Sequence, residues 1–277
     1  MPPLLWPSYS FLLKTFINFQ ESRGFICTHS LAYTFLLAFI PFSIATASIS
    51  DWLPFSNSLV DEVQTYFFSR FLPQSGTDIY DLFKLSFRHS TRLSIVGVIS
   101  LLVTTYGMMF AIEQHIHQMW HLKRQRKILQ TLFIFSGFFI LGPIITYSIA
   151  YIYRFISAKL NISVEIQYII SECLSILITT SSFIAVYKFI PNKKVSWRYA
   201  VISGVIAAGL FSILRWIFVI SMINLKEEYS LLYGSLVTLP IFLLWIYLNS
   251  FIFLYCAQII YVAEKRKNRK LKKIYSN

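Results

Sequence analysis

The segment "YGSLVTLPIFLLWIYLN", residues 233–249, joins a polar turn to a long run that contains no charged side chain. Pro240 stands near the start of that run, where a beginning helix tolerates the missing N–H of proline. The apolar sequence then continues to about Val262. A helix needs about 20 mostly apolar residues to cross the hydrocarbon core of a bilayer. The segment therefore predicts a membrane-spanning helix that the chain enters at the Tyr-Gly-Ser turn.

The composition of the whole chain indicates the same class of protein. Of the 277 residues, 56% are hydrophobic and only 13% are charged, whereas about 25% of the residues of soluble domains are charged. The mean hydropathy is +0.60. The three cysteines are far apart and form no Cys-x-x-Cys pair, so neither a disulfide framework nor a zinc ribbon is favoured. We expect no cofactor.

Five further segments are long and apolar enough to span a membrane, and a segment inside lipid must be helical because lipid offers its backbone no partner. The sequence thus predicts an all-α, polytopic transmembrane bundle as one domain over residues 1–262, followed by a basic tail at 263–277. An external helical hairpin is expected at about 56–90. The six predicted spans are about 31–50, 93–111, 128–153, 168–190, 199–223 and 236–262.

The segment from Tyr9 to Phe19 is amphipathic rather than continuously apolar. Helical spacing puts Leu12, Leu13, Phe16 and Ile17 on one side, and Lys14 is on the other. This pattern predicts an interfacial helix that lies in the plane of the membrane surface.

The 25 lysines and arginines indicate the orientation of the spans. Sixteen lie in the N-terminal segment, in alternate loops and in the tail, against seven in the other loops. Cytoplasmic loops carry the excess of basic residues, so both termini are expected in the cytoplasm. The net charge of +13 is then mainly a topology signal, with anionic membrane lipids as partners and no nucleic acid.

Several polar or charged groups fall inside the predicted spans, where they are costly and commonly face a protein interior or a wet cavity. Arg215 and Glu172 are the main charged examples. Asn249 and Gln258 are polar positions of the last span. These four residues are our candidates for a substrate cavity. For Arg215 two interpretations stay open: a contact to an anion or lipid phosphate, or one half of a structural ion pair.

Prolines fall within three different spans, at Pro41, Pro143 and Pro240. Interrupted helices expose backbone groups and can mark transporter sites, although proline also produces simple kinks in membrane helices. We therefore treat the three positions as candidate helix interruptions.

Glu113, His117 and His121 recur every four residues and would form one stripe on a helix. The two histidines have the spacing of a zinc pair, with Glu113 as a third ligand. The alternative, which we favour, is that these are ordinary polar residues at the cytoplasmic exit of the second span. His115 lies off the stripe, and we expect it at the surface.

Three segments resemble the YihY/BrkB family of inner-membrane proteins. They are "LAYTFLLAFIPF" at 31–42, "AIEQHIHQMWHLKRQRK" at 111–127 and "YGSLVTLPIFLLWIYLNSFIFLYCAQI" at 233–259. They follow the family's order and cover the chain from its first span to its last. The chain departs from the family pattern at three positions: His117 replaces the usual Asn, Cys256 the usual Gly and Gln258 the usual Glu. Proton coupling by an acidic group at 258 is therefore not expected.

The resemblance implies a multi-pass protein of the bacterial inner membrane, acting as a transporter or as a lipid- or anion-handling protein. A non-transporting envelope scaffold or virulence-associated factor is the alternative. The family once carried a ribonuclease label, but metal-dependent nucleases need clustered hard ligands around one cleft. The 12 acidic residues show no such cluster in sequence, so we do not expect an enzyme.

Overall fold

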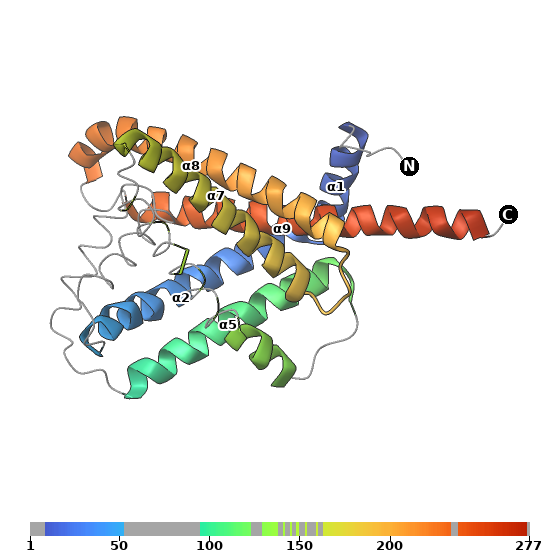
Figure 1. Cartoon of the computed structure of the whole chain (residues 1–277), viewed down its shortest axis with the longest axis horizontal. Coiled ribbons are helices and arrows are strands. Elements are labelled where there is room, and N and C mark those ends of the chain that lie inside the picture. Colours follow the sequence, from blue (N-terminus) through green and yellow to red (C-terminus); the bar gives the residue numbers. More distant parts are fainter. Residues whose placement is uncertain are drawn as a thin grey trace. The chain divides into compact units, whose positions relative to one another are not determined.

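A computed structural model of the chain describes residues 9–52, 95–122, 129–137, 141, 145, 148–149, 153, 159, 163–233 and 238–275. Within these residues every regular element is an α-helix, as the sequence predicts (Figure 1). The bounds of the helices are α1 Tyr9–Glu21, α2 Gly24–Trp52, α5 Ile95–Met119, α7 Val164–Phe189, α8 Trp197–Tyr233 and α9 Thr238–Tyr275.

Three of these helices are long and apolar enough to cross a membrane: α7 over Glu165–Phe189, α8 over Trp197–Ser221 and α9 over Pro240–Lys267. They coincide with the last three predicted spans. The first part of α2, Gly24–Ala38, is a shorter apolar helix. Within the described residues, the structure thus confirms a membrane-type helical protein, and the count of six spans stays a prediction.

The other predicted elements have different outcomes. Helix α1 coincides with the predicted amphipathic segment, and α2 and α5 cover the first two predicted spans. The external hairpin at 56–90 lies outside the described residues, as does most of the predicted span at 128–153. Helix α9 continues to Tyr275, so the basic tail forms a direct extension of the last span.

The three prolines are placed as follows. Helix α2 continues through Pro41, and Pro240 lies in the first turn of α9, where no intrahelical N–H bond is lost. Pro143 lies outside the described residues.

The chain divides into two compact units. Unit 1 comprises Met1–Phe25, Ile112–Leu210 and Ile252–Asn277, and unit 2 comprises Ile26–Ala111 and Phe211–Phe251. In unit 2, Phe218 of α8 and Trp245 of α9 form a buried pair whose ring centres are 4.9 Å apart. Unit 1 holds the polar cluster described below.

Helices α7, α8 and α9 are joined in unit 1 by side chains that bond to backbone carbonyls. The Tyr187 hydroxyl of α7 donates to the Phe253 carbonyl of α9 at 2.9 Å. The Ser203 hydroxyl of α8 donates to the Cys256 carbonyl. Both side chains are fully buried and have no access to water. Without these bonds, the two hydroxyls would therefore be unsatisfied in an apolar environment, which is costly. The helices are therefore joined by specific polar contacts as well as by apolar packing.

Gly204 permits a close approach of α8 to α7. A Cβ at this position would lie 2.4 Å from Cγ1 of Ile184 and 3.1 Å from its backbone nitrogen. At Gly209, five residues later on the same helix, nothing lies within 4 Å. The two glycines therefore form a matched pair for a packing test.

We predict that Gly204→Ala lowers the melting temperature of the detergent-solubilised protein and that Gly209→Ala does not. Overpacking costs about 1–3 kcal/mol, which exceeds the gain of about 1 kcal/mol that alanine has over glycine in a helix. The melting temperature is followed by the loss of helical circular dichroism. Equal melting temperatures for the two variants would contradict the close approach of α7 and α8.

Candidate functional site

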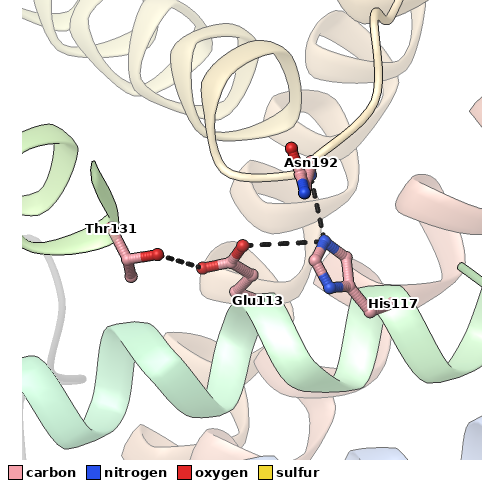
Figure 2. A network of polar contacts seen from close by, with 4 residues as sticks. All are labelled: Glu113, His117, Thr131 and Asn192. Atoms are coloured by element: carbon pink, nitrogen blue, oxygen red, sulfur yellow. Dashed lines mark hydrogen bonds and ion pairs between the residues drawn. The ribbon is translucent and has the colours of Figure 1, made fainter. Parts of the chain in front are cut away.

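A buried polar cluster lies at the end of α5 in unit 1. Glu113 and His117 are one turn apart on this helix, and only 4% and 8% of their surfaces are exposed. Nε2 of His117 lies 3.6 Å from Oε1 of Glu113. Figure 2 shows both side chains pointing away from α5 toward neighbouring segments. The sequence correctly predicted that Glu113 and His117 lie on the same side of one helix.

Two residues from other segments complete this cluster. The backbone N–H of Asn192, in the α7–α8 loop (residues 190–196), donates to Nε2 of His117 at 3.0 Å (Figure 2). The Thr131 hydroxyl, from the helical residues 129–137, donates to Oε2 of Glu113 at 3.4 Å. An N–H donor requires a lone pair on Nε2, so His117 in this arrangement is neutral with its proton on Nδ1. The histidine thus acts as an acceptor that holds the α7–α8 loop.

The α7–α8 loop has a second anchor on α9. Oε2 of Glu264 lies 2.7 Å from Nζ of Lys193, and Oε1 of Glu264 accepts the backbone N–H of Ser196 at 3.2 Å. The Lys193 ammonium also lies 5.8 Å from the ring centres of Trp120 and Tyr261, within the range of cation–π attraction. One carboxylate and two rings therefore hold the loop on this side.

A third polar contact joins α1 to α9. Nε2 of Gln258 lies 3.3 Å from the Ser22 hydroxyl and 3.5 Å from Oδ1 of Asn18. Gln258 is fully buried. This candidate substrate residue is therefore placed at the junction of two helices.

The four candidate substrate residues do not belong to one compact unit. Glu172 and Gln258 belong to unit 1, whereas Arg215 and Asn249 belong to unit 2. Glu172 and Arg215 are each half-buried. Nδ2 of Asn249 donates to the Trp245 carbonyl at 2.7 Å, which is the kind of internal partner that an amide in a membrane span requires.

The structure also contains a shallow apolar cavity of about 430 Å³ along α7. Its described lining residues are Cys173, Ile176, Leu177, Thr180, Ser181 and Ile184. None of the four candidate substrate residues is among them. The cavity therefore does not support the predicted substrate path.

The predicted stripe of three possible metal ligands does not form. Helix α5 ends at Met119, and His121 lies beyond it with φ at 52°, exposed to solvent. A residue in this left-handed conformation leaves the helical path, so its side chain does not continue the direction of Glu113 and His117. In the described part of the chain, no group of three or more His, Cys, Asp or Glu could hold a metal ion.

His115 is buried, with 9% of its surface exposed, so the prediction of a surface position was wrong. The end of α5 is enclosed, since Ile112, Ile116 and Met119 are also buried. Nδ1 of His115 has no hydrogen-bond partner among the described residues. Burial lowers the pKa of His115 from its usual value, because burial disfavours the charged form of a histidine.

Sequence reasoning did not single out Thr131, Asn192, Lys193 or Glu264 as members of a site. Lys193 entered only as one of the cations that indicate topology. The sequence carries little indication of these residues, because a backbone N–H (Asn192) and an isolated threonine (Thr131) form no recognisable motif. The strongest hint was Glu264, a single acid at the start of the basic tail.

Comparisons with known proteins point to one family. The family described as virulence factor BrkB matches residues 15–275. A UPF0761 membrane protein of Janthinobacterium sp. (strain Marseille) is 29% identical over 227 residues, which cover 79% of this chain and 52% of the relative. A UPF0761 membrane protein of Psychrobacter sp. (strain PRwf-1) is 29% identical over 91% of this chain and 48% of the relative.

A third relative, from Mannheimia succiniciproducens, is 28% identical over 88% of this chain and 86% of its own length. The chain thus spans about half of the length of the first two relatives and most of the third. No solved structure matches the chain.

We predict that His117→Ala destabilises the α7–α8 loop and that His121→Ala does not. Loss of the His117 acceptor removes its hydrogen bond to the half-buried Asn192 N–H, and such a bond contributes about 0.5–1.5 kcal/mol. Hydrogen exchange of residues 190–196 in the detergent-solubilised protein measures the effect. Unchanged exchange in His117→Ala would show that this bond does not hold the loop.

Stability should also fall with decreasing pH because of His115. The folded-state pKa is lowered from the usual 6.5, so below about pH 6.5 the unfolded chain binds more protons than the folded one. The destabilisation begins there and grows until the folded pKa is passed. Well above pH 6.5, where His115 is neutral in both states, this residue contributes no pH dependence.

The test compares the melting temperature of the natural protein and of His115→Phe across this pH range. The variant cannot titrate at this position, so its melting temperature should decrease less on acidification. Parallel pH profiles would contradict the predicted contribution of His115.

Proposed function

The chain belongs to the BrkB family of membrane proteins, and from that premise we propose that it moves a small anionic or lipid substrate between its membrane helices. We further propose that it lies in the bacterial inner membrane with both termini in the cytoplasm, in accordance with its distribution of lysine and arginine. No catalytic role is proposed.

The observation that carries the proposal is a pair of buried polar oxygens in the middle of α9. Oδ1 of Asn249 and Oγ of Ser250 have no hydrogen-bond partner among the described residues, and Ser250 is only 2% exposed. Leaving a buried polar atom unsatisfied costs about 1–3 kcal/mol, and lipid cannot relieve this cost. A polar substrate or water between the helices would satisfy both atoms.

Arg215 adds a cation to the same unit. It lies three residues before Phe218, and Asn249 lies one turn after Trp245. Since Phe218 and Trp245 are in contact, helical spacing places Arg215 and Asn249 on the sides of α8 and α9 that meet in unit 2. An arginine there provides the charge that an anion or a lipid phosphate requires.

These groups favour an anionic substrate over a neutral one. Arg215 supplies hydrogen-bond donors and the charge. The Asn249 amide oxygen accepts a hydrogen bond, so it suits a hydroxyl or an ammonium group of the same substrate molecule. A phospholipid headgroup or a small phosphate-bearing solute combines such features.

We predict that Arg215→Leu abolishes most of the transport and that Arg215→Lys retains part of it. A hydrogen bond to a charged group contributes about 1.5–3 kcal/mol, so the rate should fall about tenfold to a hundredfold in the leucine variant. Two assays on reconstituted vesicles distinguish the substrates: dithionite bleaching of a fluorescently labelled phosphatidylglycerol and the release of trapped inorganic phosphate.

Unchanged melting temperatures must show that both variants fold. If the natural protein moved neither probe, or if Arg215→Leu moved them at the natural rate, the transport proposal would be overturned. An envelope scaffold would then be the better interpretation.

A further inference from the structure

Helix α1 has three distinct sides. Thr15, Phe19 and Ser22 face the protein and are buried. Lys14 and Glu21 are exposed on a second side, about 120° around the helix from the first. Between these sides lie four large apolar residues that are 39–47% exposed: Leu12, Leu13, Phe16 and Ile17. A helix at a membrane surface needs this combination, because it has to meet protein, lipid and water at the same time.

Helix α1 crosses α9 instead of lying alongside it. Leu12 contacts Tyr255 through a hydrogen bond of 3.4 Å, and Ser22 contacts Gln258 at 3.3 Å. The ten residues from Leu12 to Ser22 extend about 15 Å along α1, whereas the three from Tyr255 to Gln258 extend only about 4.5 Å along α9. Figure 1 shows the same crossing. Since α9 is a candidate membrane span, a helix that crosses it runs roughly parallel to the membrane surface.

The crossing point lies close to exposed cations on α9. Lys265 follows Gln258 by seven residues, which is about 10 Å further along the helix and on nearly the same side. Lys265, Arg266 and Lys267 are all exposed. Along the axis of α9, the apolar side of α1 therefore comes first and the three cations follow about 10 Å later. Acyl chains and lipid phosphates follow one another in the same order across the surface of a membrane.

We infer that α1 and the exposed cations at 265–267 form one docking surface for the headgroup layer of an anionic phospholipid membrane. The four apolar side chains of α1 enter the boundary between headgroups and acyl chains. The cations contact the phosphates, and each contributes to the attraction for anionic lipid. The buried contacts of Thr15, Phe19 and Ser22 fix α1 in the orientation that this docking requires.

The test places an environment-sensitive thiol label on α1 in a Cys173→Ser background. Cys173 is exposed, whereas Cys27 and Cys256 are buried and so are protected from the reagent. One variant carries Leu13→Cys on the apolar side, and the matched control carries Lys14→Cys on the water side of the same turn. Each protein is reconstituted into vesicles that contain a lipid with a nitroxide near its headgroup.

Two lipid compositions are compared: phosphatidylcholine alone and an equal mixture of phosphatidylcholine and phosphatidylglycerol. We expect the nitroxide to quench the label at position 13 several times more strongly than the label at position 14. Quenching at position 13 should increase when phosphatidylglycerol is present. Equal quenching at the two positions would overturn the docking of α1.

The contribution of the cations is tested with Lys265→Gln, Arg266→Gln and Lys267→Gln combined in the position-13 variant. This protein should lose the additional quenching caused by phosphatidylglycerol, whereas the charge-retaining combination K265R, R266K and K267R should keep it. If the neutral combination kept the full effect of phosphatidylglycerol, the assignment of the cations would be wrong. None of these measurements depends on transport.

Discussion

The bilayer supplies no hydrogen-bond partner, and this constraint explains several polar contacts among the described residues. The Tyr187 and Ser203 hydroxyls donate to carbonyl groups of α9, because no water is available to them in an apolar environment. The ion pair of Lys193 and Glu264 lies at the α7–α8 loop. Glu264, Lys193 and Ser196 meet beyond α7 and at the start of α8, where water and headgroups lower the cost of a charge.

The α7–α8 loop shows how this constraint produces a defined local structure. It is short, and it is held from two sides by groups of different kinds. On the α5 side a neutral histidine accepts a backbone N–H, and on the α9 side a carboxylate pairs with a lysine and a backbone N–H. The end of α5, the α7–α8 loop and the stretch of α9 around Glu264 are thereby joined in unit 1, without a metal-ligand group or a disulfide among the described residues.

The sequence predicted the helical class, the last three spans and the amphipathic helix α1, because each depends on the hydropathy and spacing of consecutive residues. It did not predict the partners of Glu113 and His117, since Thr131 and Asn192 come from other parts of the chain. Nor did it predict the burial of His115, which depends on what surrounds α5. His121 was assigned to the stripe of Glu113 and His117 because the end of α5 at Met119 has no glycine or proline to mark it.

Helix α9 runs without a break from Thr238 to Tyr275, and this continuity restricts how the sequence can change. A single inserted or deleted residue rotates everything beyond it by about 100°. Between Asn249 and Gln258, such a change would turn Gln258 away from Ser22 if Asn249 kept its position. This stretch can accept substitutions far more readily than alterations of length. Indels in related sequences should therefore occur in the connections between helices and avoid α9.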